Sequence, residues 1–474
     1  MKLIPRQIIW LTIVIATNAT LWAVPSNVVE QVARDRHTML GRYSREHFSL
    51  NLGVLLISVV SFYVDWSTGR TYRKRWFQVI AVLLVLTPCL AVVDFLLRTP
   101  ERAHYVKDEV AYHRPANSTF EVVFEDRPRA VRTYPSTPDG YGKVVCKYKS
   151  DARGFRNATG LDRYDVVILG DSFAEGSSVS DEHVWAVRLA DRSGLSVYNL
   201  GMSGYDPFHY LHSLKRYGLA LKPRVVLCMV YEGNDFRSTK SDLKRLHPSV
   251  SKRFKKYVKQ SPIVGSLDDL LISTFGPINS TGALKGGEIL DWLPLAIPPG
   301  PRAKYYTFDP KQLRDLYESR EAFSADKHWL NPRRQLNSMN QLCAEAGCRF
   351  VVVFAPIKAH VVMPPVGAAL PPDKVRAFTA LRYKKPLPAP AEFLRNLLER
   401  VDARESVMRE WCEDEGILFL SVTVPLRDAA LAGEQVYYTY DQHWTPVGHD
   451  VVARAVSQFI AGRLLGEGSE TGGT

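Results

Sequence analysis

The chain has 474 residues, of which 46% are hydrophobic and 23% are charged, and its formal net charge at pH 7 is +12. This composition is ordinary for a folded protein and allows one large domain or two ordinary ones. The positive charge alone would fit a nucleic-acid-binding protein, but the sequence holds no nucleic-acid-binding motif, and basic loops beside apolar segments account for part of the excess. We therefore expect no nucleic-acid partner.

The N-terminal hundred residues contain three apolar segments, at about residues 8–24, 48–64 and 77–97. Their lengths predict a membrane region of about three transmembrane helices over residues 1–100. A dense basic cluster separates the second segment from the third, and it consists of Arg70, Arg73, Lys74 and Arg75. Such clusters stay in the cytoplasm, so everything after the third segment is expected on the periplasmic or extracellular side. A cleaved first segment and buried core helices remain alternatives.

Residues 101–155 mix charged side chains with short alternating stretches such as Phe-Glu-Val-Val-Phe at 120–124. They predict an extracytoplasmic linker or β-rich collar. Residues 156–465 then alternate between apolar, β-branched runs and amphipathic segments. Strands are expected at 166–169, 196–200, 224–230, 350–354 and 417–422, and helices at 180–194, 210–221, 331–347, 391–415 and from 446 onward. This alternation predicts an α/β domain with a parallel sheet covered on both faces.

Two insertions interrupt this pattern, at residues 237–330 and 359–390. The first begins with a basic stretch at 237–259, for which a solvated helical face and a contact with a membrane surface or polyanion are both open. Residues 466–474 are expected to be a flexible tail. The six cysteines form no CxxC pair and no zinc-ligand spacing, so neither a metal nor another cofactor is expected. Cys343 and Cys348 are either a disulfide pair or two unrelated buried thiols.

The first predicted strand leads directly to a serine. Four buried-type residues at 166–169 are followed by Gly170, Asp171 and Ser172. Open α/β sheets bind their ligands at the carboxyl ends of parallel strands, so Ser172 is a candidate nucleophile. The alternative is a strand-to-helix turn with a capping serine.

A serine nucleophile needs a base, a group that orients the base, and donors for an oxyanion. Gly204 follows the second strand and Asn234 follows the third, so a backbone N–H and an amide donor are expected at the same sheet edge. Asp441 and His443 lie just before the last helix, for which Thr445 and Pro446 are the expected cap and first residue. His443 is the candidate base and Asp441 the orienting group, whereas His449 is expected on the helix surface.

Taken together, these blocks resemble the SGNH (GDSL-type) hydrolase family. Gly-Asp-Ser-Phe at 170–173 resembles its first block, Gly204 its second, Asn234 its third, and Asp441 with His443 its last. The resemblance covers roughly residues 160–460 and implies a flavodoxin-like, doubly wound parallel sheet with ester cleavage or acyl transfer. It implies that Ser172 is the nucleophile, His443 the base and Asp441 its orienter. The Ser172 N–H, the Gly204 N–H and the Asn234 side chain would form the oxyanion hole.

Two positions depart from the usual family pattern. Only Gln442 separates Asp441 from His443, where two residues are usual, and Glu232 stands where the third block commonly has glycine. The shorter spacing is similar to that of proteins that O-acetylate alginate and related bacterial polysaccharides. The membrane-anchored layout is similar to accessory proteins that work beside membrane-bound O-acyltransferases, which makes such an enzyme an expected partner.

The sequence thus predicts a membrane-anchored serine esterase or O-acyltransferase. Its substrate would be an O-acyl group on an envelope or extracellular glycan, and the resemblance implies that this group is acetyl. An esterase for small acyl esters or lipids is the first alternative. A non-catalytic subunit with an SGNH-like domain, serving assembly or glycan binding, is the second.

Overall fold

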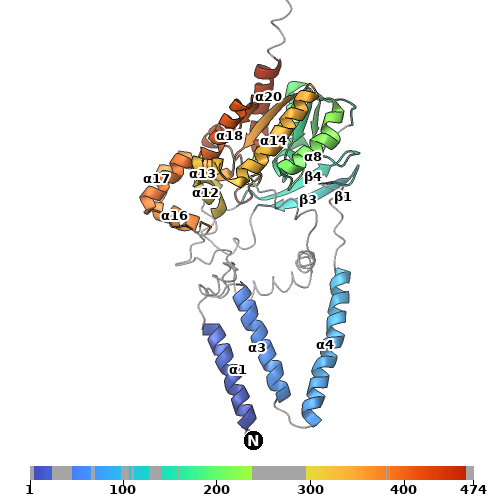
Figure 1. Ribbon diagram of the computed structural model, residues 1–474, viewed down its shortest axis with the longest axis vertical. Helices are drawn as coiled ribbons and strands as arrows, with labels where there is room; N and C mark the ends of the chain where they lie inside the picture. Colours follow the sequence, from blue (N-terminus) through green and yellow to red (C-terminus); the bar gives the residue numbers. More distant parts are fainter. Residues whose placement is uncertain are drawn as a thin grey trace, which may run out of the picture. The chain divides into compact units, whose positions relative to one another are not determined.

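The computed structural model describes residues 5–23, 45–65, 70–97, 106–107, 111–126, 140–157, 160–236, 295–380, 382–383 and 385–465 (Figure 1). The chain divides into two compact units. The first comprises Met1–Arg102 with Ser249–Leu290, and the second comprises Ala103–Pro248 with Asp291–Thr474. The predicted basic stretch at 237–259 and the tail at 466–474 lie outside the described residues.

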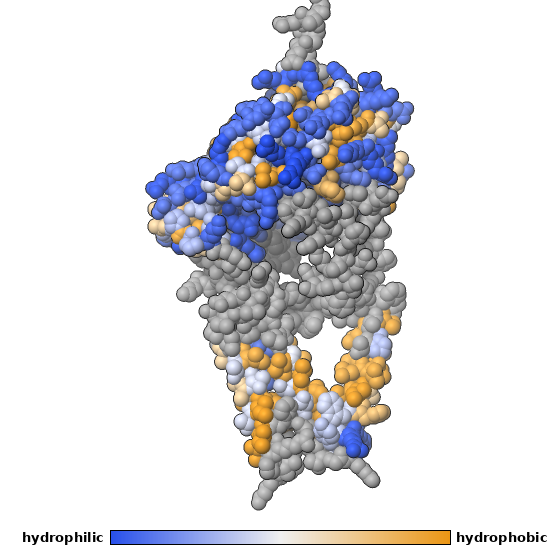
Figure 2. Space-filling model, viewed as in Figure 1, coloured by the Kyte–Doolittle hydropathy of each residue, from blue (hydrophilic) through white to orange (hydrophobic). Residues whose placement is uncertain are grey.

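Three helices make up the described part of the first unit, namely α1 (Pro5–Ala23), α3 (Arg45–Asp65) and α4 (Arg70–Leu97). Polar side chains join α1 to α3, because the Asn18 amide donates to Ser58 Oγ at 3.0 Å and the Asn51 amide donates to the Leu21 carbonyl at 3.1 Å. Many apolar side chains of the three helices are exposed, and they colour much of the visible helix surface as hydrophobic in Figure 2.

Helices therefore form where the sequence predicts the apolar segments. However, none of the helices in the described ranges is both long and apolar enough to cross a bilayer. Polar residues such as Asn18 in α1 and Asn51 in α3 interrupt the apolar runs. The prediction of N-terminal transmembrane helices is thus not supported by the structure.

A five-stranded parallel sheet organises the second unit, with the strand order β11-β10-β7-β5-β6. Its strands are β5 (Val166–Leu169), β6 (Val197–Asn199), β7 (Val225–Tyr231), β10 (Arg349–Ala355) and β11 (Leu418–Ser421). Numbered by their order in the chain, these strands follow the flavodoxin-like order 2-1-3-4-5. The predicted α/β fold with a parallel sheet is confirmed. Its topological switch point lies between β5 and β7, where such folds bind their ligands.

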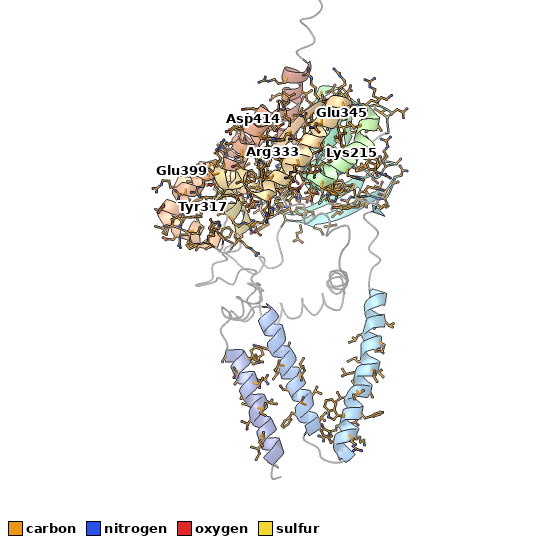
Figure 3. All side chains as sticks on the ribbon, in the orientation of Figure 1. Lys215, Tyr317, Arg333, Glu345, Glu399 and Asp414 are labelled. Atoms are coloured by element: carbon orange, nitrogen blue, oxygen red, sulfur yellow. The ribbon has the colours of Figure 1, made fainter. Side chains whose placement is uncertain are left out.

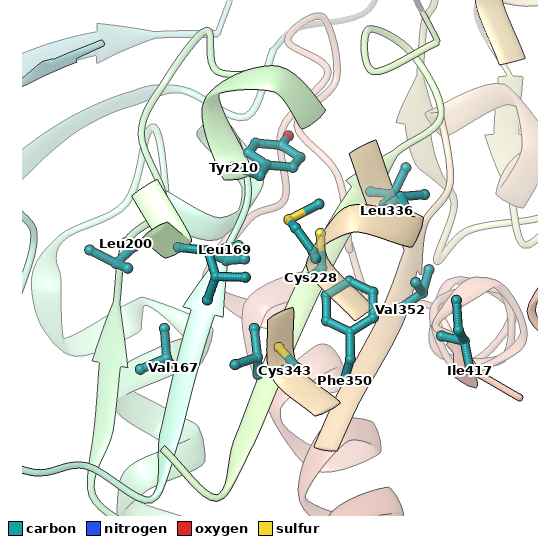
Figure 4. Close-up of a cluster of buried hydrophobic side chains, with 14 of the residues drawn as sticks. Val167, Leu169, Leu200, Tyr210, Cys228, Leu336, Cys343, Phe350, Val352 and Ile417 are labelled. Carbon is teal, nitrogen blue, oxygen red and sulfur yellow. The ribbon is translucent and has the colours of Figure 1, made fainter. Parts of the chain in front are cut away.

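Both faces of the sheet are buried. Every residue of β5 and β7 is buried, as expected for parallel strands with helices on both sides. On one face, side chains of β5, β7 and β10 form a continuous core with α8 (Pro207–Ser213), α14 (Lys327–Glu345) and α18 (Ala403–Asp414) (Figure 4). The helices α7 (Trp185–Ser193), α19 (Thr423–Leu431) and α20 (Pro446–Ile460) form a second packed group, in which α20 contacts both α7 and α19.

Several helix boundaries differ from those expected. Helix α14 begins at Lys327, because the Asp326 carboxylate accepts the His328 N–H and caps the helix five residues before the predicted start at 331. The expected helix over 391–415 is two helices, α17 (Pro390–Arg400) and α18, because Asp402 turns its carboxylate to His360 at the break. The charged residues Arg333, Glu345 and Asp414 lie on α14 and α18 in Figure 3; Glu345 and Asp414 are exposed and Arg333 is half-buried.

The remaining turns and helices connect these elements. Two short elements lie between β5 and α7, namely α6 (Ser172–Glu175) and the 3-10 turn η1 (Asp181–His183). Helix α8 continues through η2 (Leu214–Gly218) and η3 (Leu219–Leu221). The described part of the first insertion holds β8 (Leu295–Ile297), β9 (Lys304–Tyr306), α12 (Pro310–Leu316) and α13 (Arg320–Ser324). The second insertion holds α15 (Lys358–Val362), η4 (Pro364–Ala369) and α16 (Pro372–Ala380), and η5 (Ala461–Leu465) follows α20.

The predicted β-rich collar consists of two antiparallel pairs. Strand β1 (Val106–Lys107) pairs with β2 (Tyr112–His113), and β3 (Thr119–Glu125) pairs with β4 (Lys143–Lys149). These strands belong to the same compact unit as the parallel sheet. The collar is therefore packed onto the sheet domain and not an independent linker.

The core beneath α14 predicts a measurable stability effect. Leu336 is fully buried against the sheet, so Leu336→Ala removes packing contacts and leaves a cavity. We expect the free energy of unfolding to fall by about 2–5 kcal/mol, measured by chemical denaturation. Arg334→Ala, at an exposed position of the same helix, is the matched control and should change it by less than about 0.5 kcal/mol. Equal effects of the two substitutions would contradict this packing.

Candidate active site

Ser172 lies at the sheet's switch point. It is the first residue of α6, which begins directly after β5 and Gly170. The Asp171 carboxylate caps this helix by accepting the Phe173 N–H at 2.9 Å. A side chain at Gly170 would bring its Cβ to 2.5 Å from the Ala174 Cβ, so glycine is required for this tight strand-to-helix turn.

The structure brings together the three residues expected to form a triad. His443 Nε2 lies 2.8 Å from Ser172 Oγ, and His443 Nδ1 lies 2.6 Å from Asp441 Oδ1. The same Asp441 oxygen accepts the His443 backbone N–H at 2.8 Å, which fixes the turn between the two residues. The one-residue spacing through Gln442 therefore still allows the carboxylate to hold the imidazole. Both ring nitrogens have the partners that nucleophilic catalysis requires.

Nearby carboxylates favour the protonated form of His443. Burial alone would lower the pKa of His443, but the Asp441 carboxylate, its hydrogen bond, and the charges of Asp171 and Glu175 together raise that pKa above its usual value. Burial would raise the pKa of Asp441, but the facing His443 and the Lys358 ammonium lower it to about 2. Asp441 is therefore ionised at neutral pH and stabilises an imidazolium at position 443.

Aromatic side chains pack against the imidazole of His443. The Phe173 ring stacks on Tyr231 with centroids 4.0 Å apart, and it contacts the His443 ring at 5.0 Å and Trp444 at 4.8 Å. The Tyr231 hydroxyl donates to Gln442 Oε1 at 3.2 Å. These contacts restrict rotation of the His443 ring and hold the residue between Asp441 and His443 in place.

Gly204 lies in a loop whose peptide orientation is fixed from two sides. The Tyr112 hydroxyl donates to the Ser203 carbonyl at 2.7 Å, and the Ser203 N–H donates to Glu175 Oε2 at 2.8 Å. Glu175 is fully buried and paired with Arg114 of the collar at 2.7 Å. Gly204 has a φ of +83°, and a Cβ there would lie 2.7 Å from the Tyr112 hydroxyl, so this position requires glycine.

Asn234 reaches the same region from the end of β7. Its amide Nδ2 donates to Asp171 Oδ2 at 2.8 Å, and its Oδ1 is buried without a hydrogen-bond partner. Burial raises the pKa of Asp171, although the Phe173 N–H and the Asn234 amide oppose this shift. The Asn234 amide is thus held beside the residue preceding Ser172, with one of its two N–H groups engaged by Asp171.

The departure at Glu232 has a structural explanation. Its side chain is fully buried, and Oε2 accepts the Ile357 N–H at 3.0 Å and lies 2.9 Å from His360 Nδ1. On the other side of the ring, His360 Nε2 lies 2.8 Å from Asp402 Oδ1. The buried Glu232 carboxylate therefore joins a charge cluster with the buried His360 and the largely exposed Asp402.

Within the described ranges, one group of side chains has metal-ligand spacing, namely His360, Asp402 and Glu405, whose ligand atoms lie within 4.8 Å of one another. Both imidazole nitrogens already face carboxylate oxygens. Although burial would lower it, the charge of Glu232 and the hydrogen bonds to Asp402 and Glu232 raise the pKa of His360 to about 10. A protonated imidazole between carboxylates fully accounts for this cluster.

Two buried residues near the triad, Asp126 and Lys358, could not be recognised from the sequence. Asp126 follows β3 in the collar and accepts the N–H groups of Thr439, Tyr440 and Asp441 at 2.6, 3.0 and 2.9 Å. Lys358 begins α15 and is fully buried. Asp126 is over 300 positions from the loop that it contacts, and neither residue belongs to a recognisable motif.

The expectation for His449 is wrong. It lies on α20 but is buried, and its Nδ1 accepts the Trp185 N–H at 3.4 Å. Burial, together with the charges of Arg156 and His443, holds its pKa well below the usual value. His449 therefore joins α20 to the start of α7 as a neutral core residue. Thr445 and Pro446 do begin the helix as predicted, because Thr445 Oγ1 accepts the Gly448 N–H.

Comparison with known proteins matches one part of the chain to a family. Residues 368–472 match the family described as an SGNH hydrolase-like domain, acetyltransferase AlgX. This part of the chain is therefore similar to an SGNH hydrolase-like domain. The matched residues include Asp441 and His443, whereas Ser172 and Asn234 lie outside them. The predicted resemblance to SGNH hydrolases and to alginate-acetylating proteins is confirmed, as is the class of enzyme, a serine hydrolase or related acetyltransferase that acts on esters.

Solved structures with similarity to the SGNH hydrolase-like domain have low identity. A catalytic mutant of Axe2, an acetylxylan esterase from Geobacillus stearothermophilus, is 10% identical with a TM-score of 0.30, covering 63% of this chain and 95% of that one. A GDSL-like lipase from Bacteroides thetaiotaomicron is 14% identical with a TM-score of 0.27, covering 64% of this chain and 92% of that one. No curated protein matches the chain.

The His360 cluster predicts a pH dependence of stability. Because the folded pKa of about 10 exceeds the ordinary 6.5, this stabilisation is complete below about pH 6.5 and is lost as pH rises through about 10. His360→Gln should remove this component from the free energy of unfolding, measured by denaturant titration between pH 6 and 10. His328→Gln, at an exposed position, is the control and should keep the wild-type dependence. A His360→Gln protein with that same dependence would contradict the assignment.

Proposed function

We propose that the chain is a serine esterase or O-acyltransferase that acts through Ser172, His443 and Asp441 on O-acyl groups of an envelope or extracellular glycan. The observation that carries this proposal is the continuous contact from Ser172 Oγ through both imidazole nitrogens to the Asp441 carboxylate. A neutral serine hydroxyl is a weak nucleophile, and an adjacent base with an orienting carboxylate is the arrangement that activates it.

The geometry gives each residue a chemical role. Ser172 Oγ attacks the acyl carbonyl carbon while His443 Nε2 accepts the hydroxyl proton, and the new imidazolium is stabilised by ionised Asp441. Collapse of the tetrahedral intermediate expels the leaving alkoxide, which takes the proton from His443, and leaves an acyl-serine. His443 then takes a proton from the incoming hydroxyl, which attacks the acyl-serine. The second tetrahedral intermediate collapses, the acyl–Oγ bond breaks, and His443 returns the proton to Ser172 Oγ. Water as acceptor gives hydrolysis, and a glycan hydroxyl gives transfer.

The oxyanion would be stabilised by three donors. The Ser172 N–H is at the first position of α6, where an N–H has no acceptor within the helix. The Gly204 N–H belongs to the peptide group that Tyr112 orients, and the Asn234 amide has a second N–H besides the one given to Asp171. Donors held in place before the reaction stabilise developing negative charge without reorganisation.

A cavity of about 750 Å³ lies beside the segment that leads to Asn234, and its lining residues include none of the triad. As a neighbouring subsite, it supports a substrate larger than a small ester. It is lined by Gly233, which directly precedes Asn234, and its walls combine flat aromatic rings with charged side chains. These include Tyr317, Tyr383, Lys311, Arg400 and Arg404. Its volume lies within the ~300–1,000 Å³ range of ligand sites, and rings with polar neighbours suit a carbohydrate. An esterase for small acyl esters or lipids is the alternative, and the non-catalytic subunit is disfavoured by the intact triad geometry.

Association with a membrane and a location outside the cytoplasm are also proposed. Exposed apolar side chains on α1, α3 and α4, among them Ile9, Leu56 and Leu84, support the membrane contact. The basic residues at the start of α4 support a cytoplasmic position for that end of the helix. A membrane-bound O-acyltransferase that delivers the acyl group is the proposed protein partner.

The triad predicts that substitutions of its residues remove ester cleavage while the protein stays folded. In the full-length protein, Ser172→Ala should abolish cleavage of an activated acetyl ester and should abolish labelling by a fluorophosphonate, which in the wild type should attach to Ser172. His443→Ala should have nearly the same effect on cleavage. Asp441→Asn should reduce kcat by up to about 10⁴-fold through the wrong imidazole tautomer. Asn234→Ala should reduce it by about 10²–10³-fold, the value of one oxyanion donor.

Circular dichroism of each variant should match the wild type. Ser177→Ala, on the loop after α6, is the control, since its hydroxyl contacts Ser203 Oγ and not the triad. A wild-type protein that takes no label and cleaves no ester would favour the binding subunit. Label with poor turnover in water but good turnover with a glycan hydroxyl would assign transfer.

The basic start of α4 predicts the location of the domain. A reporter that is active only outside the cytoplasm should be active when fused after about residue 105 and inactive when fused near Arg73. The physical reason is that a dense basic cluster resists transfer across the membrane. Enzyme activity of paired fusions, normalised to their abundance, measures this. The reverse pattern would contradict the proposed localisation.

A further inference from the structure

The collar contacts the catalytic loops through buried polar groups. Asp126, at the end of β3, is 1% exposed, and its two carboxylate oxygens accept four backbone N–H groups. Three of these donors are consecutive, at residues 439–441, so one carboxylate fixes the turn that leads into Asp441. A buried backbone N–H without an acceptor is costly, and Asp126 satisfies three of them in a segment with no regular secondary structure.

The carbonyls of the same turn are held from the opposite side. The Lys358 ammonium donates to the Tyr438 and Thr439 carbonyls at 2.7 and 2.9 Å. Thr307 adds its N–H at 2.8 Å and its hydroxyl at 2.9 Å to the Thr439 carbonyl. The Asp126 carboxylate binds the N–H groups of this turn, and the Lys358 ammonium binds its carbonyls. Together they determine the path of the backbone before Asp441.

The two buried charges also compensate each other. Burial raises the pKa of Asp126, whereas its N–H donors and the Lys358 charge oppose that shift. Burial lowers the pKa of Lys358 to about 7, and the charges of Asp126 and Asp441 oppose this change. Each buried charge therefore lowers the cost of burying the other.

Tyr112 of β2 contacts the other catalytic loop. Its hydroxyl binds the Ser203 carbonyl at 2.7 Å, in the peptide group that also contains the Gly204 N–H. A trans peptide group is planar, with its C=O and N–H pointing in opposite directions, so fixing the carbonyl also fixes the N–H. The hydrogen bond from Tyr112 therefore sets the direction in which the Gly204 N–H points.

We propose that the collar is a positioning element of the active site, in which Asp126 holds the turn that presents Asp441 to His443 and Tyr112 orients the peptide that presents the Gly204 N–H. Neither residue touches the reacting atoms. This inference rests on the proposed roles of His443, Asp441 and Gly204. It assigns a function in catalysis to a segment that, by sequence, is a linker between the N-terminal helices and the sheet.

The test compares Asp126→Asn and Tyr112→Phe with the wild type, using the full-length protein and an activated acetyl ester over a range of pH. Asp126→Asn should lower kcat by about 10²-fold, the effect of misplacing a catalytic group by about 1 Å, with KM little changed. The acid limb of the pH profile of kcat/KM for this variant should move to lower pH. The reason is that the pKa of His443 is raised by Asp441, Asp171 and Glu175, and a displaced Asp441 raises it less.

Tyr112→Phe should lower kcat by about 10–10²-fold with no movement of the acid limb, because it affects the oxyanion donor and not the base. Glu121→Gln is the matched control, since Glu121 is an exposed acid on β3 whose ion-pair partner is Lys147 at 4.0 Å. It should behave as the wild type. The double variant Asp126→Asn with Asp441→Asn should be no slower than Asp441→Asn alone, because both act through one interaction.

A purely structural role would reduce activity equally at all pH values, in proportion to the folded fraction, and would leave the acid limb in place. That result, or additive effects in the double variant, overturns the positioning role of Asp126 while the wild type remains active. A wild type that takes no fluorophosphonate label overturns the proposed function as well. If Asp126→Asn does not fold, Asp126→Glu keeps the charge and shifts the carboxylate, and its acid limb is measured in the same way.

Discussion

The contact of His443 with Ser172 on one side and Asp441 on the other is the interaction on which the rest of the site depends. It requires the end of β5 and the start of α20, which are about 270 positions apart in the chain, to meet within hydrogen-bond distance. The parallel sheet makes this possible, because its strand order reverses between β5 and β7, the point at which such folds bring the loops of their sites together. The core formed with α14 packs against β5, and α20 packs against α7 and α19.

Buried charge is the second recurring constraint. Glu175 with Arg114, Asp126 with Lys358, and His360 with Glu232 each place a charged group where water does not reach. Isolated, each group would destabilise the fold; paired, and bonded to backbone groups, it restricts a loop to one conformation. These clusters lie along the loops that follow the strands. This placement fits a site whose loops lack regular secondary structure and need side chains to fix them.

Local sequence patterns predicted much of the fold. The apolar runs at 166–169 and 350–354 predicted buried strands, because both faces of a parallel strand are covered and no alternation is needed. Thr445 and Pro446 predicted the start of α20, since a capping hydroxyl and a proline at the first position are both local preferences. One boundary failed for a local reason, because Asp326 caps α14 ahead of the expected start at 331. Another failed because of a tertiary contact, since Asp402 turns to His360 where one expected helix divides into two.

The sequence by itself determined which residues make up the candidate site: a serine after a buried strand, a histidine and an aspartate before the last helix, and an asparagine after β7, in an order that resembles the SGNH family. These residues were recognisable because each occupies a strand end or helix start, which local sequence specifies. Only the tertiary structure decided that the collar contributes Asp126 and Tyr112, that Glu232 faces His360, and that His449 is buried. Such contacts depend on side chains from distant segments meeting in three dimensions, and neither their spacing nor their residue type marks them in the chain.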